Sequence, residues 1–368
     1  MRSETGTTSR RAALRYLGLG GGAVAASSVL AACTSVQEGQ NGGDGGTSGV
    51  FPDTPDWRFV FVNHVTTNSF FVPTRTGLED AAALLGVPKP QWTGSENGNV
   101  AQMASAMETA INSKVDGIAI ALTDDNAFVD LTKRALGAGI PVVAYNANAA
   151  NNFPLTYVGQ DLYLSGVRMG ERIAEKVTSG DILVGISQPG GNNVQPRLDG
   201  IIDALKQKAP GVRVRSVNTG AEQAAELNAI TAAYTGNTGV KGIYAVDAGT
   251  TAACASLIAD RGLSGKIGGG GFDLLDDSVE GVNAGALDFT IDQSPYLQGF
   301  LSVLYLYLYR LSGTLVFPPV TDTGLTFVTK ENIGPYAEEH STFEGGDNKD
   351  LIEMPSSIPL PPPSVLNR

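Results

Sequence analysis

The chain has 368 residues and a formal net charge of −12, with 25 lysines and arginines against 37 aspartates and glutamates. An acidic chain without basic clusters argues against binding to nucleic acid or to an anionic membrane surface. Its length allows two domains, and its apolar content of 42% is ordinary for a globular protein.

The first predicted element is an export signal rather than part of the fold. Paired arginines, Arg10 and Arg11, precede an apolar run of small residues over 17–32, which ends at Cys33. This segment resembles a bacterial lipoprotein signal, in which the cysteine thiol takes the lipid, and its arginine pair resembles a twin-arginine export signal. We therefore expect residues 1–33 to be a signal peptide with Cys33 as the lipid anchor.

A flexible tether and then the folded part follow the signal. Residues 34–56 are rich in glycine and polar residues, and Trp57 marks where the core is expected to begin. The apolar run over 59–62 predicts a buried parallel strand, and residues 74–85 predict a helix that Gly86 ends. Polar and aromatic residues gather between the two, which is typical of a ligand site in an open α/β sheet.

The same strand–helix plan repeats along the chain. In the first run we predict further strands over 90–93, 117–122, 141–145 and 155–159, and helices over 99–113 and 123–138. In the second run we predict strands over 181–187, 212–217, 242–246, 266–272, 288–291 and 324–329, and helices over 162–177, 194–209, 221–234, 250–261 and 295–311. Such alternation gives parallel sheets with right-handed crossovers, and two runs hold too many strands for one compact sheet. We therefore predict an α/β protein with two doubly wound domains.

Two smaller features complete this pass. The last segment, 355–368, holds five prolines and is predicted to stay outside any sheet interior. The second cysteine, Cys254, lies in a small-residue helical stretch and is expected to be a buried hydrophobe.

Several short motifs, weak singly, carry a family resemblance through their order and spacing. They are Asn68-Ser69-Phe70-Phe71, Asp116-Gly117-Ile118, Gly139-Ile140-Pro141-Val142-Val143, Arg197-Leu198-Asp199-Gly200, Ala245-Val246-Asp247, Gly271-Phe272-Asp273 and Thr290-Ile291-Asp292-Gln293-Ser294-Pro295. Over about 57–332 the chain resembles the ribose/galactose type (type I) of periplasmic sugar-binding protein, the receptor component of ATP-driven (ABC) importers.

The resemblance implies two lobes that are not contiguous in sequence. One would consist of 57–160 with 294–328, and the other of 161–293 with 329–354. A hinge of three chain crossings would join them, and the ligand would sit between them and be enclosed by hinge bending. The implied protein is an extracytoplasmic monomer whose partners are a small neutral sugar or polyol and the importer's permease, and which touches the membrane only through its lipid anchor.

The resemblance also implies the ligand contacts. Phe70 and Phe71 match the position that lies flat against a sugar ring, although either could be a plain core residue. Charged and amide side chains match contacts to sugar hydroxyls, namely Asn68, Gln160, Arg197, Asp247, Asp273 and Gln293. Two of these have a simpler alternative, because Arg197 could be a helix-surface residue and Asp273 could cap the following helix. Phe272, in the same motif as Asp273, is the last of the predicted ligand-contact residues.

Departures from the family pattern leave the sugar open. Asn146 stands where the family often has Asp, and Asn148 is close by. His64 replaces a small hydroxyl residue and is either a hydroxyl partner or a capped structural residue. Trp92 ends a strand and either stacks on the ligand or belongs to the core. The Tyr-Asn-Ala-Asn and Gly-Gly-Gly-Phe-Asp patterns are closer to receptors for fructose-like sugars or sugar alcohols than to ribose receptors.

Other functions fit the sequence less well. Residues 63–77 contain no G-x-G-x-x-G loop for a dinucleotide, and the chain has no G-x-S-x-G motif. With only His64 and His340 as histidines, we predict no metal site and no cofactor. A repressor of this fold would begin with a helix-turn-helix, where this chain carries the signal and tether. A receptor for a furanosyl autoinducer and a glycosidase with a carboxylate pair stay open as alternatives.

Overall fold

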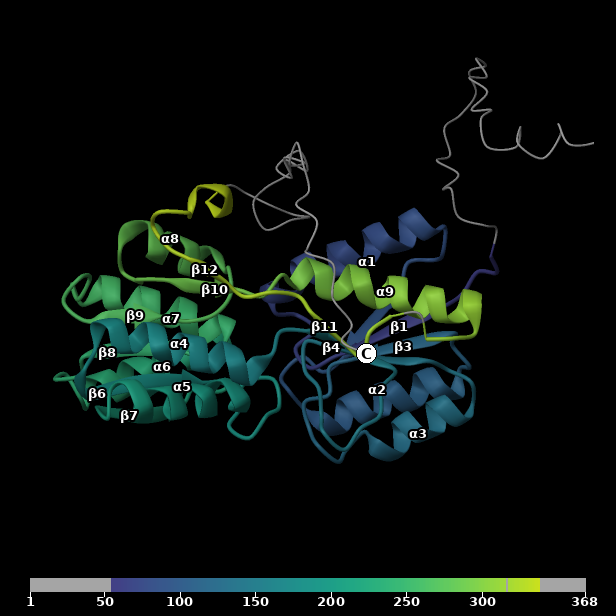
Figure 1. The fold of residues 1–368 in the computed structure, drawn as a ribbon, viewed down its shortest axis with the longest axis horizontal. Helices are drawn as coiled ribbons and strands as arrows, with labels where there is room; N and C mark the ends of the chain where they lie inside the picture. The colour runs from purple at the N-terminus through teal and green to yellow at the C-terminus, as the bar shows by residue number, and fades with distance from the viewer. Residues whose placement is uncertain (1–53, 316, 338–368) are drawn as a thin grey trace, which may run out of the picture. The chain divides into compact units, whose positions relative to one another are not determined.

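The computed structural model describes residues 54–315 and 317–337 (Figure 1). The predicted signal with Cys33, most of the tether and the proline-rich segment 355–368 lie outside the described residues. None of the helices in the described part is long and apolar enough to cross a membrane.

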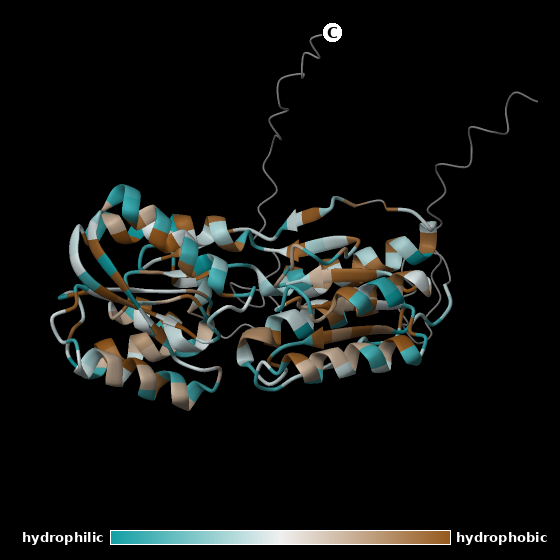
Figure 2. Cartoon of the chain, turned by 90° about the horizontal axis from the view of Figure 1, so that it is seen from below, coloured by the Kyte–Doolittle hydropathy of each residue, from teal (hydrophilic) through white to brown (hydrophobic). Residues whose placement is uncertain are grey.

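The N-terminal lobe is built on a six-stranded, all-parallel sheet with the strand order β11-β5-β4-β3-β1-β2. Its strands are β1 (Phe59–Asn63), β2 (Gln91–Gly94), β3 (Gly117–Ile120), β4 (Val142–Tyr145), β5 (Thr156–Gly159) and β11 (Val320–Asp322). Helices α1 (Val72–Leu85) and α9 (Pro295–Ser312) cover one face, and α2 (Val100–Asn112) and α3 (Val129–Gly137) cover the other (Figure 1). Because both faces are covered, the inner strands β1, β3 and β4 are buried along their whole length. Figure 2 shows these strands as brown, hydrophobic ribbons between helices that carry both colours.

The C-terminal lobe is built on a four-stranded parallel sheet with the order β7-β6-β8-β9. Its strands are β6 (Ser179–Ile186), β7 (Gly211–Asn218), β8 (Gly242–Ala245) and β9 (Gly268–Gly270). Its helices are α4 (Leu162–Lys176), α5 (Gln195–Lys208), α6 (Gln223–Thr235), α7 (Ala248–Asp260) and α8 (Asp276–Ala284).

Side-chain alternation along β6 divides the core of this lobe into two halves. Ile182, Val184 and Ile186 belong to the apolar cluster beneath α4 and α5, whereas Leu183 belongs to the cluster beneath α6, α7 and α8. Successive residues of a strand point to opposite faces, so one strand serves both clusters. Cys254 is buried in the second cluster, as predicted. The prediction of an α/β class with two doubly wound parallel sheets is confirmed.

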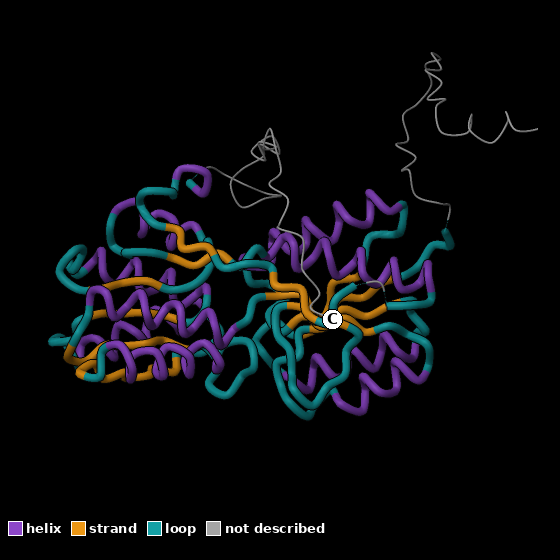
Figure 3. Tube along the Cα trace, viewed as in Figure 1, coloured by secondary structure: helices purple, strands orange, loops and turns teal. Residues whose placement is uncertain are grey.

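The chain passes between the two sheets three times: after β5, after β10 (Thr290–Asp292), and between β11 and β12 (Thr326–Val328) (Figure 3). The last predicted boundary, between residues 328 and 329, is wrong by a few residues. β12 pairs antiparallel with β10 and not with the six-stranded sheet, so the third crossing follows Asp322. The sequence pattern did not reveal β11, because this edge strand holds a single apolar residue, Val320, which is exposed.

One predicted helix start is also wrong. Residues 123–128 form turns, and α3 begins only at Val129. The reason is local, because the Asp124 carboxylate accepts hydrogen bonds from the backbone N–H groups of Asn126 and Ala127 at 2.8 Å each. These bonds close an Asx-type turn in place of the first helical turn. Elsewhere the helix α1 is preceded by a 3-10 turn, η1 (Ser69–Phe71), and a second one, η2 (Gly334–Tyr336), follows β12.

Candidate functional site

A wall of aromatic rings stands where β1 ends in the N-terminal lobe. Asn68 caps η1, its side-chain oxygen accepting from the backbone N–H of Phe70 at 2.9 Å. This turn places the rings of Phe70 and Phe71 edge to face, with centroids 4.7 Å apart. Phe71 also contacts the His64 ring at 5.4 Å and the Trp92 ring at 5.8 Å. The wall is therefore held from behind by further rings and has little freedom to rotate.

Arg197 is the central cation of the C-terminal lobe, and only 3% of its surface is exposed. Its guanidinium lies 3.9 Å from the centre of the Phe272 ring, within cation–π range. One terminal nitrogen donates to the Val246 carbonyl at 3.0 Å, and the other donates to Oε1 of Gln160 at 3.1 Å. Gln160 in turn donates to the Gly324 carbonyl at 3.0 Å. The guanidinium plane is thus fixed from below by a ring and at its edges by hydrogen bonds.

A close helix crossing brings Arg197 to this place. A Cβ added at Gly166 in α4 would lie 2.1 Å from the Arg197 carbonyl oxygen, and one added at Gly200 in α5 would lie 2.3 Å from that of Tyr163. No side chain other than hydrogen fits at either position, so the two helix backbones touch. This contact holds the first turns of α5, and with them Arg197, against the body of the lobe.

Two carboxylates flank Arg197. Asp247 accepts from the backbone N–H groups of Ser187 at 2.9 Å and Thr250 at 3.0 Å, the second bond capping α7. Asp273 adopts a left-handed backbone conformation with φ of 75° and accepts from Nε2 of Gln293 at 2.6 Å. Burial raises the pKa of Asp273 to about 7, although Arg197 lowers it. Asp273 does not cap α8, which begins at Asp276 with no side-chain cap, so that alternative is wrong.

Amide side chains continue this set from the C-terminal lobe into the N-terminal lobe. Nε2 of Gln298 donates to Oε1 of Gln293 at 3.2 Å, and Nδ2 of Asn146 donates to Oε1 of Gln298 at 3.1 Å. Asn146 has a φ of 62°, a conformation that asparagine tolerates better than most residues. Asp273, Gln293, Gln298 and Asn146 therefore form one hydrogen-bonded row that spans both lobes.

Most of the predicted residues line one small cavity of about 60 Å³. The cavity is lined by the predicted His64, Asn68, Phe70, Phe71, Asn146, Arg197, Asp247, Asp273 and Gln293, together with residues such as Ser187, Gln188, Asn193 and Glu226 that were not predicted. The aromatic rings come from the N-terminal lobe, the charged groups come from the C-terminal lobe, and both lobes contribute amides. Such a mixture suits a ligand with an apolar face and a rim of hydroxyl groups.

Three buried polar atoms on this lining have no hydrogen-bond partner among the described residues: Nδ1 of His64, Oδ1 of Asn193 and Nε of Arg197. Burial lowers the pKa of His64 to about 4, so its ring is neutral. Nδ2 of Asn193 donates to Nε2 of His64 at 3.3 Å, which leaves the ring proton on Nδ1. The lining thus offers two unused donors and one unused acceptor, which is the pattern expected where a polar ligand binds.

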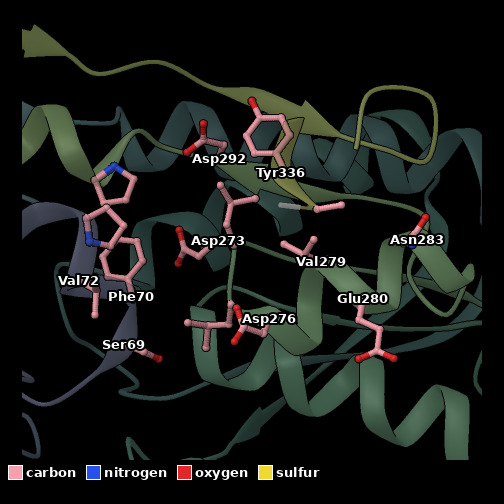
Figure 4. A pocket seen from close by; sticks show the side chains of 15 residues that line it. Ser69, Phe70, Val72, Asp273, Asp276, Val279, Glu280, Asn283, Asp292 and Tyr336 are labelled. Carbon is pink, nitrogen blue, oxygen red and sulfur yellow. The ribbon is translucent and has the colours of Figure 1, made fainter. Parts of the chain in front are cut away.

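A second, larger cavity of about 680 Å³ adjoins the first and shares Phe70 and Asp273 with it. Figure 4 shows these two side chains directed toward one another, with Asp276 and Glu280 of α8 on the far side. The Phe70 and Asp273 side chains thus lie between the two cavities. The lining of the larger cavity is acidic and contributes no cation.

Four predicted residues do not line the small cavity. Trp92 packs behind Phe71 and donates to the Thr66 carbonyl at 3.1 Å, so it supports the ring wall. Gln160 and Phe272 are buried and hold Arg197. Asn148 is exposed and accepts from the backbone N–H of Ala149 at 3.0 Å, so the structure gives it no place in the site.

Sequence reasoning also missed residues on this lining. Ser187, predicted as the last residue of a strand, and Gln188 and Asn193, predicted to lie in a loop, follow β6 in the structure, and Glu226 lies within α6. The strand-end position of the loop could have pointed to the first three. No sequence signal singled out Glu226, since a glutamate within a helix is usually solvated. In the part of the chain that the structure describes, no group of three potential metal ligands occurs.

Comparisons with known proteins place this architecture in a family. The family described as "Periplasmic binding protein domain" matches residues 59–313. A curated relative, the xylose/arabinose-binding protein XylF of Sulfolobus acidocaldarius, is 44% identical over 313 residues, which cover 81% of this chain and 77% of the relative.

Two solved structures give the same fold. A solute-binding protein from Burkholderia graminis in complex with D-arabinose is 26% identical, with a TM-score of 0.73 over 78% of this chain and all of that one. A carbohydrate transporter protein from Acidothermus cellulolyticus in complex with myo-inositol is also 26% identical, with a TM-score of 0.68 over 77% of this chain and 97% of that one. These relatives are described as binding or transport proteins and not as enzymes. The chain belongs to the family of periplasmic binding proteins.

Proposed function

We propose that this protein is the extracytoplasmic solute-binding component of an ABC importer and that it binds a neutral monosaccharide between its two lobes. The observation that carries this proposal is the small cavity, where the unpaired Nδ1 of His64, Oδ1 of Asn193 and Nε of Arg197 lie beside the Phe70–Phe71 wall. Ring faces stack on the C–H surface of a sugar, and its hydroxyls can pair with the unused polar atoms.

The favoured ligand is an aldopentose. Support comes from the 44% identical relative, which is described as a xylose/arabinose-binding protein, and from the Burkholderia neighbour, which holds D-arabinose. A fructose-like sugar or a sugar alcohol, which the sequence pattern favours, is the second choice. The myo-inositol complex of the Acidothermus neighbour supports that class.

Binding requires the lobes to move. A cavity of about 60 Å³ is well below the ~300 Å³ at which ligand pockets begin, so a sugar can reach it only if the two walls separate. Apart from the bonds at the hinge, that motion must break several contacts across the cavity mouth. They include the His64–Asn193 contact, the bond from Nε2 of Gln188 to the Gly98 carbonyl at 3.3 Å and the bond from Nδ2 of Asn192 to Asp125 at 2.9 Å. The backbone N–H of Asn192 also donates to the Thr123 carbonyl at 3.0 Å. We propose that the sugar replaces some of these contacts and holds the lobes closed.

The same proposal gives the protein its cellular setting. The family is periplasmic, so the binding event takes place outside the cytoplasm. Anchoring through a lipid on Cys33 and delivery to a permease complete the proposed cycle. A monomer suffices, because one chain supplies both walls of the cavity.

The test is isothermal titration calorimetry of the folded chain against D-xylose, L-arabinose, D-arabinose, D-fructose, myo-inositol and a furanosyl autoinducer. A sugar should bind one to one and raise the melting temperature, because it binds only the folded state. Chromatography of the recovered ligand should show it unchanged. If none of the carbohydrates binds, the proposal is wrong. Binding of the autoinducer alone would favour a signalling receptor, and a chemically converted ligand would point to an enzyme.

A further inference from the structure

We propose that Glu226 contacts the ligand and determines specificity, presenting its carboxyl group as a hydrogen-bond donor beside the Asp247 carboxylate. The proposal rests on the proposed sugar-binding function and names the ligand feature that the site selects. That feature is a free hydroxyl group on a neutral sugar, as opposed to a deoxy position or a carboxylate.

Packing fixes the position of Glu226. The residue lies on α6, is 3% exposed and lines the small cavity. A Cβ added at Gly249, in the first turn of α7, would lie 1.9 Å from its Oε2, so the carboxyl group rests directly on the α7 backbone. The hydroxyl of Thr250 lies 3.5 Å from its Oε1. The carboxyl group is therefore wedged at the head of α7, next to Asp247.

The two carboxyl groups cannot both be ionised there at low cost. Asp247 already receives backbone N–H bonds from Ser187 and Thr250, which favour its charged form. Glu226 forms no ion pair with any residue that the structure describes. Burial, followed by the charge of Asp247, raises the pKa of Glu226 to about 9. Glu226 thus holds the proton at neutral pH and donates it toward Asp247.

Other ionisable groups around Glu226 do not change this assignment. Glu222, the residue before α6, is exposed and raises the pKa of Glu226 further. The Cys254 thiol of α7 stays protonated because burial raises its pKa. Across the cavity stand neutral His64, the Arg197 cation and Asp273. The charge of Arg197 interacts with Asp247 and Asp273.

This arrangement selects ligands by hydrogen-bond type. A sugar hydroxyl that enters between the pair replaces their direct contact: it accepts from the Glu226 O–H and donates to the Asp247 carboxylate, using both of its capacities. A deoxy position cannot replace that contact and gains neither hydrogen bond. A sugar acid would bring a third negative group to the pair. The site should therefore accept aldoses and polyols and reject uronates.

The experiment compares Glu226→Gln, Glu226→Ala and, as the matched control in the residue that precedes the same helix, the exposed Glu222→Gln. Calorimetry uses the tightest sugar from the panel above, its monodeoxy analogues and its uronate. Glu226→Gln keeps a neutral donor and should retain affinity within about threefold at pH 7. Glu226→Ala should weaken binding by about 10-fold to 100-fold and should lose discrimination against one deoxy analogue. Glu222→Gln should match the wild type throughout.

The pH profile gives a second readout. Wild-type affinity should fall by about tenfold for each pH unit above 9, as Glu226 ionises, and Glu226→Gln should remove that fall. Equal discrimination by wild type and Glu226→Ala, or equal alkaline profiles for wild type and Glu226→Gln, would overturn the inference.

A readout without ligand separates this inference from the proposed function. In the free protein, Glu226→Gln should gain stability relative to wild type as pH rises from 6 to about 9, because the unfolded wild type releases the Glu226 proton in this range while the folded protein retains it. If no sugar binds but this gain is seen, the proposed sugar-binding function is wrong. Glu226 is then still a buried, protonated carboxyl group, but its ligand belongs to another class. Parallel melting curves for the two proteins would overturn the assignment of a buried protonated carboxyl at Glu226.

Discussion

The two walls of the small cavity divide the work of binding. The N-terminal lobe contributes rings and neutral amides, with Phe70, Phe71, His64 and Asn146 on its side. The C-terminal lobe contributes every residue of the lining that carries or can carry a charge at neutral pH: Arg197, Glu226, Asp247 and Asp273. Stacking needs only a firm surface, whereas orientation of hydroxyls needs fixed charges. We therefore expect stacking on the ligand to come from the N-terminal lobe and the pH dependence of binding to come from the C-terminal lobe.

The lobes nevertheless use the same device to hold their helices. In the N-terminal lobe a Cβ added at Gly299 of α9 would lie 2.0 Å from the Thr74 carbonyl oxygen of α1. In the C-terminal lobe the corresponding crossing is that of Gly200 against Tyr163. The first crossing supports an apolar layer, and the second positions Arg197. Substitutions at the two crossings can therefore distinguish an effect on folding from an effect on binding.

The largest effect is expected from Arg197→Ala. It should weaken sugar binding by about 2–4 kcal/mol, because two buried carboxylates and the ligand lose a common cation. Binding is measured by calorimetry at pH 7, with the melting temperature as a check on folding. Arg197→Lys, which keeps the charge but not the planar fork, should recover only part of the loss. Wild-type affinity in Arg197→Ala would show that the central cation of the C-terminal lobe does not contribute to sugar binding.

A matched glycine pair comes next. Gly200→Ala and Gly299→Ala should each destabilise the fold by about 1–3 kcal/mol, since backbone contact outweighs the gain of ~1 kcal/mol in helix propensity. Chemical denaturation measures both losses. Only Gly200→Ala should also lower sugar affinity at a temperature where both variants stay folded, because α5 carries Arg197. Equal affinity in the two variants would show that the α4–α5 crossing does not position the cation.

Much of the fold could be predicted from the sequence, for a clear physical reason. Strands buried on both faces read as unbroken apolar runs, as in 59–62, and helices between them show one apolar face. The failures lie where a single local contact decides. Asp124 diverts the chain into a turn, and β11 is defined by backbone pairing with β5 rather than by its side chains.

The candidate site was predictable only in part. Asp273 could be identified because it follows a predicted strand, and parallel strands deliver their carboxyl ends to one edge. Arg197, in the first turn of α5, was identified only through the family motif that contains it. Whether a side chain lines the cavity depends on rotamer and packing, and Asn148, which was predicted to contact the ligand, is exposed and does not line the small cavity. Glu226 was overlooked because its burial follows from Gly249, a neighbour more than twenty positions later in the sequence.

Phe71→Ala tests the uncharged side of the cavity, which the N-terminal lobe contributes. Loss of the ring should weaken sugar binding by about 1–3 kcal/mol, through lost stacking and a cavity beside Trp92. The pH dependence of binding should stay as in wild type, because no titrating group is changed. A different pH profile in this variant would show that the two walls are not independent, and Phe71→Tyr serves as the control that keeps the ring.

Asp273→Asn tests the charged residues of the C-terminal lobe through the pH dependence of protein stability. The pKa of this carboxyl is raised in the folded state to about 7, so the stability it contributes is present at low pH and is lost as pH rises through about 7. Melting temperatures between pH 4.5 and 7.5 should therefore fall less steeply for Asp273→Asn than for wild type. Unchanged slopes would mean that Arg197 offsets the burial of Asp273 more fully than its position indicates.

The smallest effect is expected from Asn148→Ala. The side chain is exposed and accepts a hydrogen bond from the backbone N–H of the neighbouring Ala149. Affinity and stability should both stay within about 0.5 kcal/mol of wild type, as is usual for surface substitutions. Its near neighbour Asn146 is the informative contrast, because Asn146→Ala breaks the amide row to Gln298 and Gln293 and should weaken binding. If Asn148→Ala lost as much sugar affinity as Asn146→Ala, the ligand contacts of the N-terminal lobe would extend to the exposed side of the loop after β4.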